Sequence, residues 1–132
     1  MVDLAFDERF DHVMKDFTYE TAPPGEAVAT LKVTTALSNS FGTLHGGAVC
    51  LLVDIISTLA LLSQENPRPN VSVDLNVSFL APALVGDVVR LHGRVLKEGG
   101  RLAYTHVDIF RVGDDAHIAA ARHTKAFRPA KL

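Results

Sequence analysis

The sequence predicts an α+β fold in which one long apolar helix packs against a curved antiparallel sheet of about five strands. Two observations predict it: an apolar run of helical length at about residues 46–63, and segments of alternating apolar and polar residues on both sides of that run. With 132 residues, 48% of them hydrophobic, the chain is long enough for one compact core. We therefore expect a single domain over residues 1–132.

The first elements are expected to be a short amphipathic helix, at about residues 3–17, and one strand. Apolar residues of this helix recur at helical spacing: Phe6, Phe10, Val13, Met14 and Phe17. Two consecutive prolines and a glycine in the segment 21–25 end the helix. Ala29, Leu31 and Val33 then alternate with polar residues, which predicts the first strand with these three side chains inward.

The central helix is predicted from about Gly46 to Ser63, and the proline-containing segment 66–70 ends it. Because this helix is apolar on almost every side, one sheet face cannot cover it. A second copy of the chain is the simplest additional cover, so we expect at least a homodimer, with sheets joined edge to edge and the two helices side by side.

The rest of the chain is predicted to be sheet. Apolar and polar residues alternate from Val71 to Phe79, and Pro82 ends that strand. Three further strands are expected at 88–96, 102–111 and 118–127, joined by the glycine-containing turns 97–100 and 113–115. Strands joined by such short turns are antiparallel.

Charge and cysteine content exclude several classes of protein. The formal net charge is −2 with mixed signs, so we expect no nucleic-acid partner. Asp54 at the centre of the apolar run argues against a transmembrane segment. A single cysteine, Cys50, fits a reducing compartment, and the acidic N-terminal segment is unlike a transit peptide or a secretory signal. We expect a cytoplasmic protein; association with mitochondria through partners stays compatible with this sequence.

Asp54 is the main indication of function, because it is the one residue between Ala48 and Leu62 that is neither apolar nor a small hydroxyl residue. A carboxylate in an apolar helix costs several kcal/mol unless it is paired, and burial would raise its basicity. Gly46 and Gly47 leave the helix start without side chains, so a ligand oxygen can approach unpaired N–H groups. These two features are about 12 Å apart along the helix at about 1.5 Å per residue. If both serve one site, Asp54 must come from the partner chain.

Each of these residues has a structural alternative. Asp54 could pair with a partner-chain group, and the glycines could allow close helix packing. Cys50 is interpreted as core packing rather than as a nucleophile. No histidine spacing indicates a metal site. Basic residues near the C-terminus are interpreted as a solvated tail rather than as ligands of phosphate: Arg122, Lys125, Arg128 and Lys131.

Several motifs together resemble those of the hotdog-fold acyl-coenzyme A thioesterases. They are Asn39-Ser40-Phe41-Gly42-Thr43-Leu44-His45-Gly46-Gly47, then Leu52-Val53-Asp54, Ser57-Thr58, Val71-Ser72-Val73-Asp74 and Arg122-His123-Thr124-Lys125. The resemblance covers nearly the whole chain after the first helix. It implies a hotdog fold, an antiparallel sheet of five to six strands wrapped around one long central helix, and a dimer of dimers.

The resemblance also implies roles for individual residues. The N–H of Gly46 polarises the thioester carbonyl, and Asn39 helps to hold that carbonyl or the attacking water. Asp54 of the facing subunit is general base or nucleophile, Ser72 orients the water, and His45 hydrogen-bonds the thioester. Coenzyme A contacts fall on three places: the segment Phe79, Leu80, Ala81, Pro82, Ala83 and Leu84; the loop Lys97, Glu98, Gly99, Gly100, Arg101 and Leu102; and Ala126.

We therefore predict an enzyme that hydrolyses medium- to long-chain fatty acyl-CoA, with no cofactor, since coenzyme A is part of the substrate. Two alternatives stay open: a non-catalytic acyl-CoA binding module, and a hotdog hydratase or dehydratase. The first would not need Asp54. The second would want a histidine cooperating with the acid, and none follows Asp54 on its helix. Without the resemblance, Asn39 would be a turn residue and Ser72 a surface hydroxyl.

Overall fold

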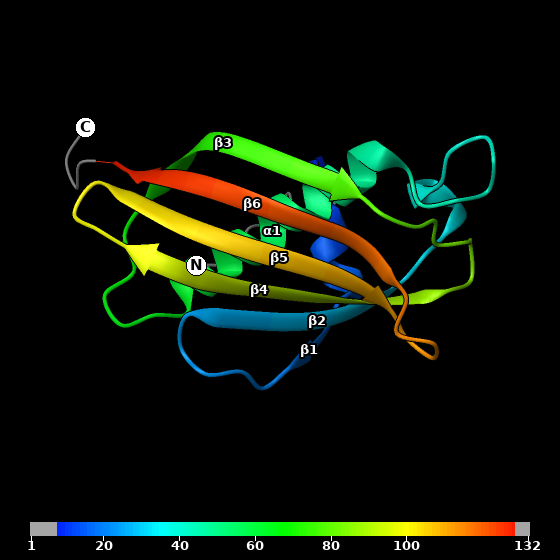
Figure 1. Cartoon of the computed structure of the whole chain (residues 1–132), viewed down its shortest axis with the longest axis horizontal. Coiled ribbons are helices and arrows are strands. Elements are labelled where there is room, and N and C mark those ends of the chain that lie inside the picture. Colours follow the sequence, from blue (N-terminus) through cyan, green and yellow to red (C-terminus); the bar gives the residue numbers. More distant parts are fainter. Residues whose placement is uncertain (1–7, 129–132) are drawn as a thin grey trace.

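A six-stranded antiparallel sheet curves around one helix in the computed structural model, which describes residues 8–128 (Figure 1). Along the sheet the strand order is β1-β2-β4-β5-β6-β3. The strands are β1 (Thr18–Glu20), β2 (Glu26–Lys32), β3 (Asn70–Phe79), β4 (Val88–Glu98), β5 (Leu102–Arg111) and β6 (His117–Phe127). This arrangement confirms the predicted α+β class and the antiparallel pairing of the strands joined by short turns.

Helix α1 (Gly46–Leu62) lies behind the sheet in Figure 1 and forms the core with its inner face. Leu52 and Ile56 of α1 pack with Leu91 and Ile109 of the sheet, and all four side chains are fully buried. Gly93 of β4 lets the helix approach closely, because a Cβ atom there would lie 2.9 Å from the Ile56 carbonyl oxygen. The predicted bounds of the central helix are confirmed to within one residue.

The N-terminal helix expected at about residues 3–17 is wrong for the part that the structure describes. Residues 3–7 lie outside the described residues, and a 3-10 helix spans only His12–Asp16. Strand β1, which follows it, was not expected, because its three residues are all exposed and give no alternating pattern. Strand β2 begins three residues earlier than the first alternating residue, Ala29.

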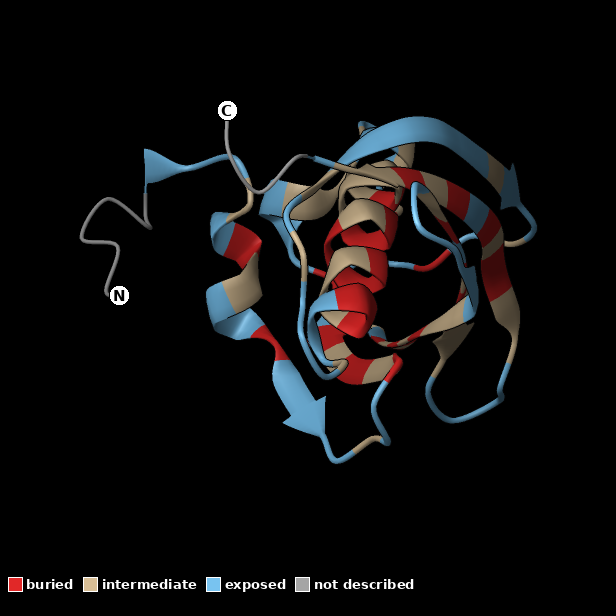
Figure 2. Cartoon of the chain, turned by 90° about the vertical axis from the view of Figure 1, so that its left-hand side faces the viewer, coloured by how far each residue is buried: buried red, intermediate tan, exposed pale blue. Residues whose placement is uncertain are grey.

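One chain does not cover helix α1 on every side, as expected from its apolar surface. One face of it stays at least partly exposed, at Gly47, Leu51, Asp54, Thr58 and Leu62. The edge strand β3, at the top of Figure 2, is exposed along most of its length. Its exposed apolar side chains include Val71, Val73 and Leu75. The helix face and the edge strand are therefore the two surfaces on which a second copy could be accommodated.

No helix among the described residues is long and apolar enough to cross a membrane.

A β-bulge interrupts the alternation of β3 and changes which side chains face the helix. The register with β6 shifts between Ser72 and Asp74, so that Ser72 pairs with Lys125 and Leu75 pairs with His123. Because Lys125 and His123 lie two residues apart on β6, Ser72 and Leu75 face the same side of the sheet. The strict period of two expected from Val71 to Phe79 is therefore broken, and the bulge directs Ser72 to the side of the sheet that faces the helix.

Candidate functional site

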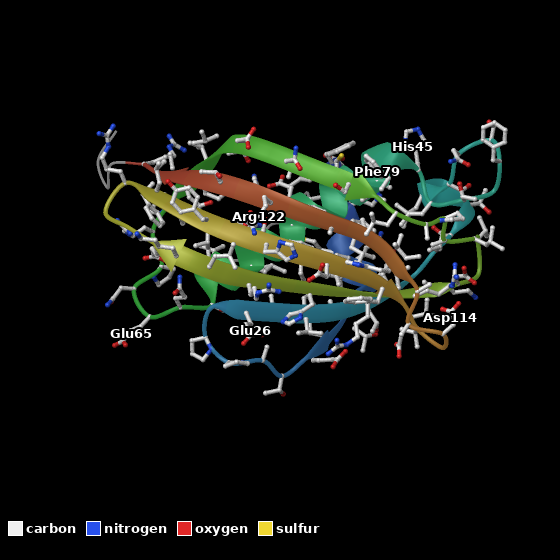
Figure 3. All side chains as sticks on the ribbon, viewed as in Figure 1. Glu26, His45, Glu65, Phe79, Asp114 and Arg122 are labelled. Carbon is white, nitrogen blue, oxygen red and sulfur yellow. The ribbon has the colours of Figure 1, made fainter. Side chains whose placement is uncertain are left out.

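The start of α1 presents a backbone N–H with no side chain over it. His45 is the N-cap, and its Nδ1 accepts a hydrogen bond of 2.8 Å from the N–H of Gly47. Accepting this bond leaves the ring proton of neutral His45 on Nε2, so that nitrogen is a donor. The N–H of Gly46 is among the first four of the helix, which have no acceptor within it. Figure 3 labels His45 and Phe79 at the same end of the molecule, and a Cβ atom on Gly46 would lie 3.5 Å from the Phe79 ring.

Asn39 has the turn role that was considered as its alternative. Its Oδ1 accepts from the N–H groups of Phe41 and Thr43, at 3.0 and 3.1 Å, and its Nδ2 donates to Thr43 Oγ1 at 2.8 Å. These bonds fix the loop that leads into α1. A contact between Asn39 and the substrate stays a prediction, for which the second hydrogen on Nδ2 is the available donor.

A second cluster lies further along α1, where Asp54 faces β6. Its Oδ1 is 3.9 Å from His123 Nδ1 and 3.8 Å from Lys125 Nζ. His123 also connects the helix to β3, because its Nδ1 is 2.7 Å from Ser57 Oγ and its Nε2 is 2.8 Å from Ser72 Oγ. Ser72 is exposed, and the fold places its hydroxyl next to His123, on the side of the sheet that faces the helix.

The hydrogen bonds of Ser57 favour one tautomer of His123. The single hydroxyl hydrogen of Ser57 is donated to the carbonyl oxygens of Val53 and Asp54, at 2.8 and 3.1 Å. This is compatible with the His123 tautomer in which Nδ1–H donates to Ser57 Oγ and Nε2 accepts the hydrogen of Ser72. Burial lowers the pKa of His123, and Lys125 lowers it further, which favours this neutral form. The lone pairs of Ser72 are left to accept a hydrogen bond from a water molecule.

One expectation about charge in this region is wrong, and one is not met by the single chain. The Asp54 side chain is 49% exposed, so in the single chain it does not lie buried among apolar groups. The Lys125 side chain is only 5% exposed, so it is not part of a solvated tail. Neither His123 nor Lys125 was selected from the sequence as a site residue. The period of two in β6 was the available signal, since Ala119, Ala121, His123 and Lys125 share the buried face of that strand.

One chain does not bring all the predicted site residues together. Gly46, His45 and the segment 79–84 lie at one end of α1, whereas Asp54 and Ser72 lie further along it. The loop 97–102 and Ala126 lie at the opposite end of the sheet, where Leu102 and Val71 both pair with Ala126. A site that uses both ends therefore has to combine two chains.

Two cavities adjoin the start of α1. One, of about 440 Å³, is lined mostly by apolar side chains, among them Val13, Leu31, Leu37, Ala48 and Leu51, and it opens beside His45 and Gly47. The other, of about 340 Å³, is lined by Gly46 and by residues of the segment 79–83. Both have the size typical of small-molecule sites.

Comparisons with known proteins agree with this geometry. A family model of the thioesterase superfamily matches residues 41–117. Acyl-coenzyme A thioesterase 13 of Homo sapiens is 42% identical over 116 residues, which are 88% of this chain and 83% of that protein. The crystal structure of zebra fish thioesterase superfamily member 2 superposes with a TM-score of 0.88 at 36% identity and covers 94% of both chains.

A more distant structure contains a bound ligand. A hypothetical thioesterase from Streptococcus pneumoniae TIGR4, crystallised with coenzyme A, superposes with a TM-score of 0.83 at 25% identity. The match covers 94% of this chain and 96% of that one. The fold thus accommodates coenzyme A in a similar protein.

Proposed function

This chain belongs to the thioesterase superfamily, and from that premise we propose that it hydrolyses medium- to long-chain fatty acyl-CoA to free fatty acid and CoA. Its fold is the hotdog fold that the sequence predicts. The enzyme is an acyl-CoA thioesterase; the chain-length range and the roles of individual residues are the parts proposed here.

The observation that carries the mechanism is that two complementary groups lie apart on one helix. We call them half-sites: the Gly46 N–H at the start of α1, and Asp54 with Ser72 further along it. The N–H of Gly46 donates to the thioester carbonyl oxygen, where negative charge develops as the carbonyl is attacked. Asp54 of the partner subunit removes a proton from water or attacks the carbonyl directly. Ser72 of that same subunit accepts a hydrogen bond from the water when its own hydrogen is donated to His123, whose Nε2 lies 2.8 Å from Ser72 Oγ.

A dimer in which the two helices run antiparallel would bring these half-sites together. The partly exposed face of α1 and the exposed edge strand β3 supply the apolar surface that such a dimer needs. A dimer of dimers and a cytoplasmic location, with association at mitochondria as the alternative, also belong to this proposal.

The cavity of about 440 Å³ supports the preference for longer acyl chains. Its lining includes His45 and Gly47, the chain neighbours of Gly46, and apolar side chains such as Val13, Leu31 and Leu51, together with polar ones such as Asp16 and Lys32. Burial of each methylene group there would add about 0.8 kcal/mol to binding.

The hydratase alternative needs a separate argument, because the fold places a histidine near the acid after all. His123 Nδ1 is 3.9 Å from Asp54 Oδ1, although no histidine follows Asp54 on its helix. Both ring nitrogens of His123 are already hydrogen-bonded, to Ser57 and Ser72, and the side chain is 1% exposed. It therefore cannot reach a hydroxyacyl chain as an acid or base.

The test is release of free thiol from medium- and long-chain acyl-CoA, followed with a colorimetric thiol reagent. Only a thioesterase releases thiol; a binding module and a hydratase do not. Asp54→Asn and Asp54→Ala should lower kcat by a factor of about 10²–10⁴ while leaving substrate binding nearly unchanged. If either variant keeps most of the wild-type rate, Asp54 is not the base.

A further inference from the structure

We propose that Lys125 is a positioning residue for Asp54: its ammonium group, anchored on Thr58, holds one carboxylate oxygen of Asp54 so that the other faces the reacting thioester. The proposal rests on the proposed function, because it takes Asp54 as the residue that activates water. It adds to that mechanism a cation to which the sequence analysis gave no role at the reacting thioester.

The contacts of Lys125 define a short bridge from β6 to α1. Its Nζ is 3.2 Å from Thr58 Oγ1 and 3.8 Å from Asp54 Oδ1. Asp54 and Thr58 are four residues apart on α1, so their side chains lie on the same face, one turn apart. One ammonium group thus contacts two consecutive turns of the helix, and the hydroxyl fixes where the charge lies.

The same geometry distinguishes the two oxygens of the carboxylate. Lys125 and His123 both approach Oδ1, at 3.8 and 3.9 Å. An exposed carboxylate rotates freely, whereas one whose Oδ1 is held by a buried cation presents Oδ2 in a fixed direction. A carboxylate oxygen that already points at the attacking water speeds proton transfer more than one that must first be oriented in each catalytic cycle.

Packing alone does not explain a lysine at this position. The side chain is 5% exposed, and burying an ammonium group is costly unless a charge or hydrogen bonds compensate for it. Methionine would fill the same space without that cost. Burial lowers the pKa of Lys125, while the charge of Asp54 opposes the shift. Lys125 therefore loses its proton at a lower pH than an exposed lysine does.

The pH dependence follows from the groups that face this carboxylate. From β6 these are His123 and Lys125, and Asp74 of β3 acts on His123. His123 is already neutral near neutral pH, so the positive charge beside Asp54 is that of Lys125. Raising the pH removes this charge, and we expect kcat of the wild-type enzyme to fall on the alkaline side, below the pH at which an ordinary lysine titrates.

The experiment compares Lys125→Met with the wild type in the thiol-release assay over a range of pH. Lys125→Met should lower kcat about tenfold at neutral pH, with KM nearly unchanged, and should abolish the alkaline decline. In the Asp54→Asn background the same change should have no further effect, because Lys125 acts through Asp54. Lys15→Met, which removes an exposed lysine from the 3-10 helix, should leave the profile unchanged.

Thr58→Val supplies a second, nearly isosteric variant that removes only the anchoring hydroxyl. It should lower kcat in the same direction but less. A Lys125→Met enzyme within about twofold of the wild type, or an equal loss from Lys125→Met with and without Asp54, would overturn the proposal. An inactive wild type would instead refute the proposed function, so the two failures are distinguishable.

Discussion

At the residue scale, the direction of each hydrogen bond decides which side-chain atoms remain available to donate to, or accept from, a water molecule. When the helix carbonyls accept the hydrogen of Ser57, His123 donates at Nδ1 and accepts at Nε2. Ser72 then has only lone pairs to offer to water. A serine that sequence reasoning would treat as a surface hydroxyl becomes a directed acceptor because a buried histidine orients it.

The role of the Gly46 N–H can be tested by Gly46→Pro, which removes the donor and little else. Proline is favoured at the first position of a helix, and His45 already has the extended conformation (φ −64°, ψ 139°) that a residue before proline prefers. A Cβ atom at this position meets only Phe79, at 3.5 Å. We expect normal folding by circular dichroism and a kcat lower by a factor of about 10²–10³ in the thiol-release assay.

Gly46→Ala is the matched control, because it keeps the N–H and adds the same Cβ atom. If proline and alanine reduce kcat equally, the loss comes from the added carbon and the N–H is not the donor.

At the element scale, one β-bulge and one glycine place the site. The bulge after Ser72 directs that residue toward His123, and Gly93 lets α1 lie close to β4, next to the strands that carry the site. Neither feature follows from hydrophobic alternation. A bulge inserts a residue without changing composition, and a strand glycine is as compatible with a turn as with a close approach.

Gly93→Ala should destabilise the protein by about 1–3 kcal/mol, because the new methyl group would lie 2.9 Å from the backbone carbonyl oxygen of Ile56. Chemical denaturation followed by circular dichroism measures this loss. Gly100→Ala, which adds a methyl group in open space, should cost far less. Equal stability of the two variants would mean that the helix can move away from β4 at no cost.

At the scale of the whole molecule, the proposed enzyme requires two chains for each reaction. The half-site at Gly46 and the half-site at Asp54 lie about 12 Å apart on the same helix, at about 1.5 Å per residue. Gly46→Pro and Asp54→Asn should each inactivate both sites of their own homodimer. In a mixed dimer, one site combines the intact Gly46 of one chain with the intact Asp54 of the other.

Mixing the two inactive variants under conditions that exchange subunits should therefore restore activity, up to about a quarter of the wild-type value if pairing is random and each variant homodimer contributes nothing. Sedimentation analysis gives the oligomeric state of each sample. Mixed dimers without activity would show that the two half-sites do not work across the subunit boundary.

Much of the fold could be predicted from the sequence, because periodicity reflects burial directly. The central helix and the strands from 70 to 127 were placed in this way. The N-terminal helix was not, because the apolar residues there also fit a 3-10 turn followed by extended chain. Of the site, Asp54 and the glycines were found because a lone acid in an apolar run and a helix start without side chains are local signals.

The sequence by itself determined the fold class, the central helix and the acid on it, since each depends on residues close together in the chain. Only the tertiary structure decided that His123 and Lys125 lie near Asp54, that Ser72 is on the helix side of the sheet beside His123, and that the acid is half exposed. These facts depend on strand order and register: β3 pairs with β6, whose residues come 40 to 57 positions later in the chain, and a single bulged residue determines which side chains meet the helix.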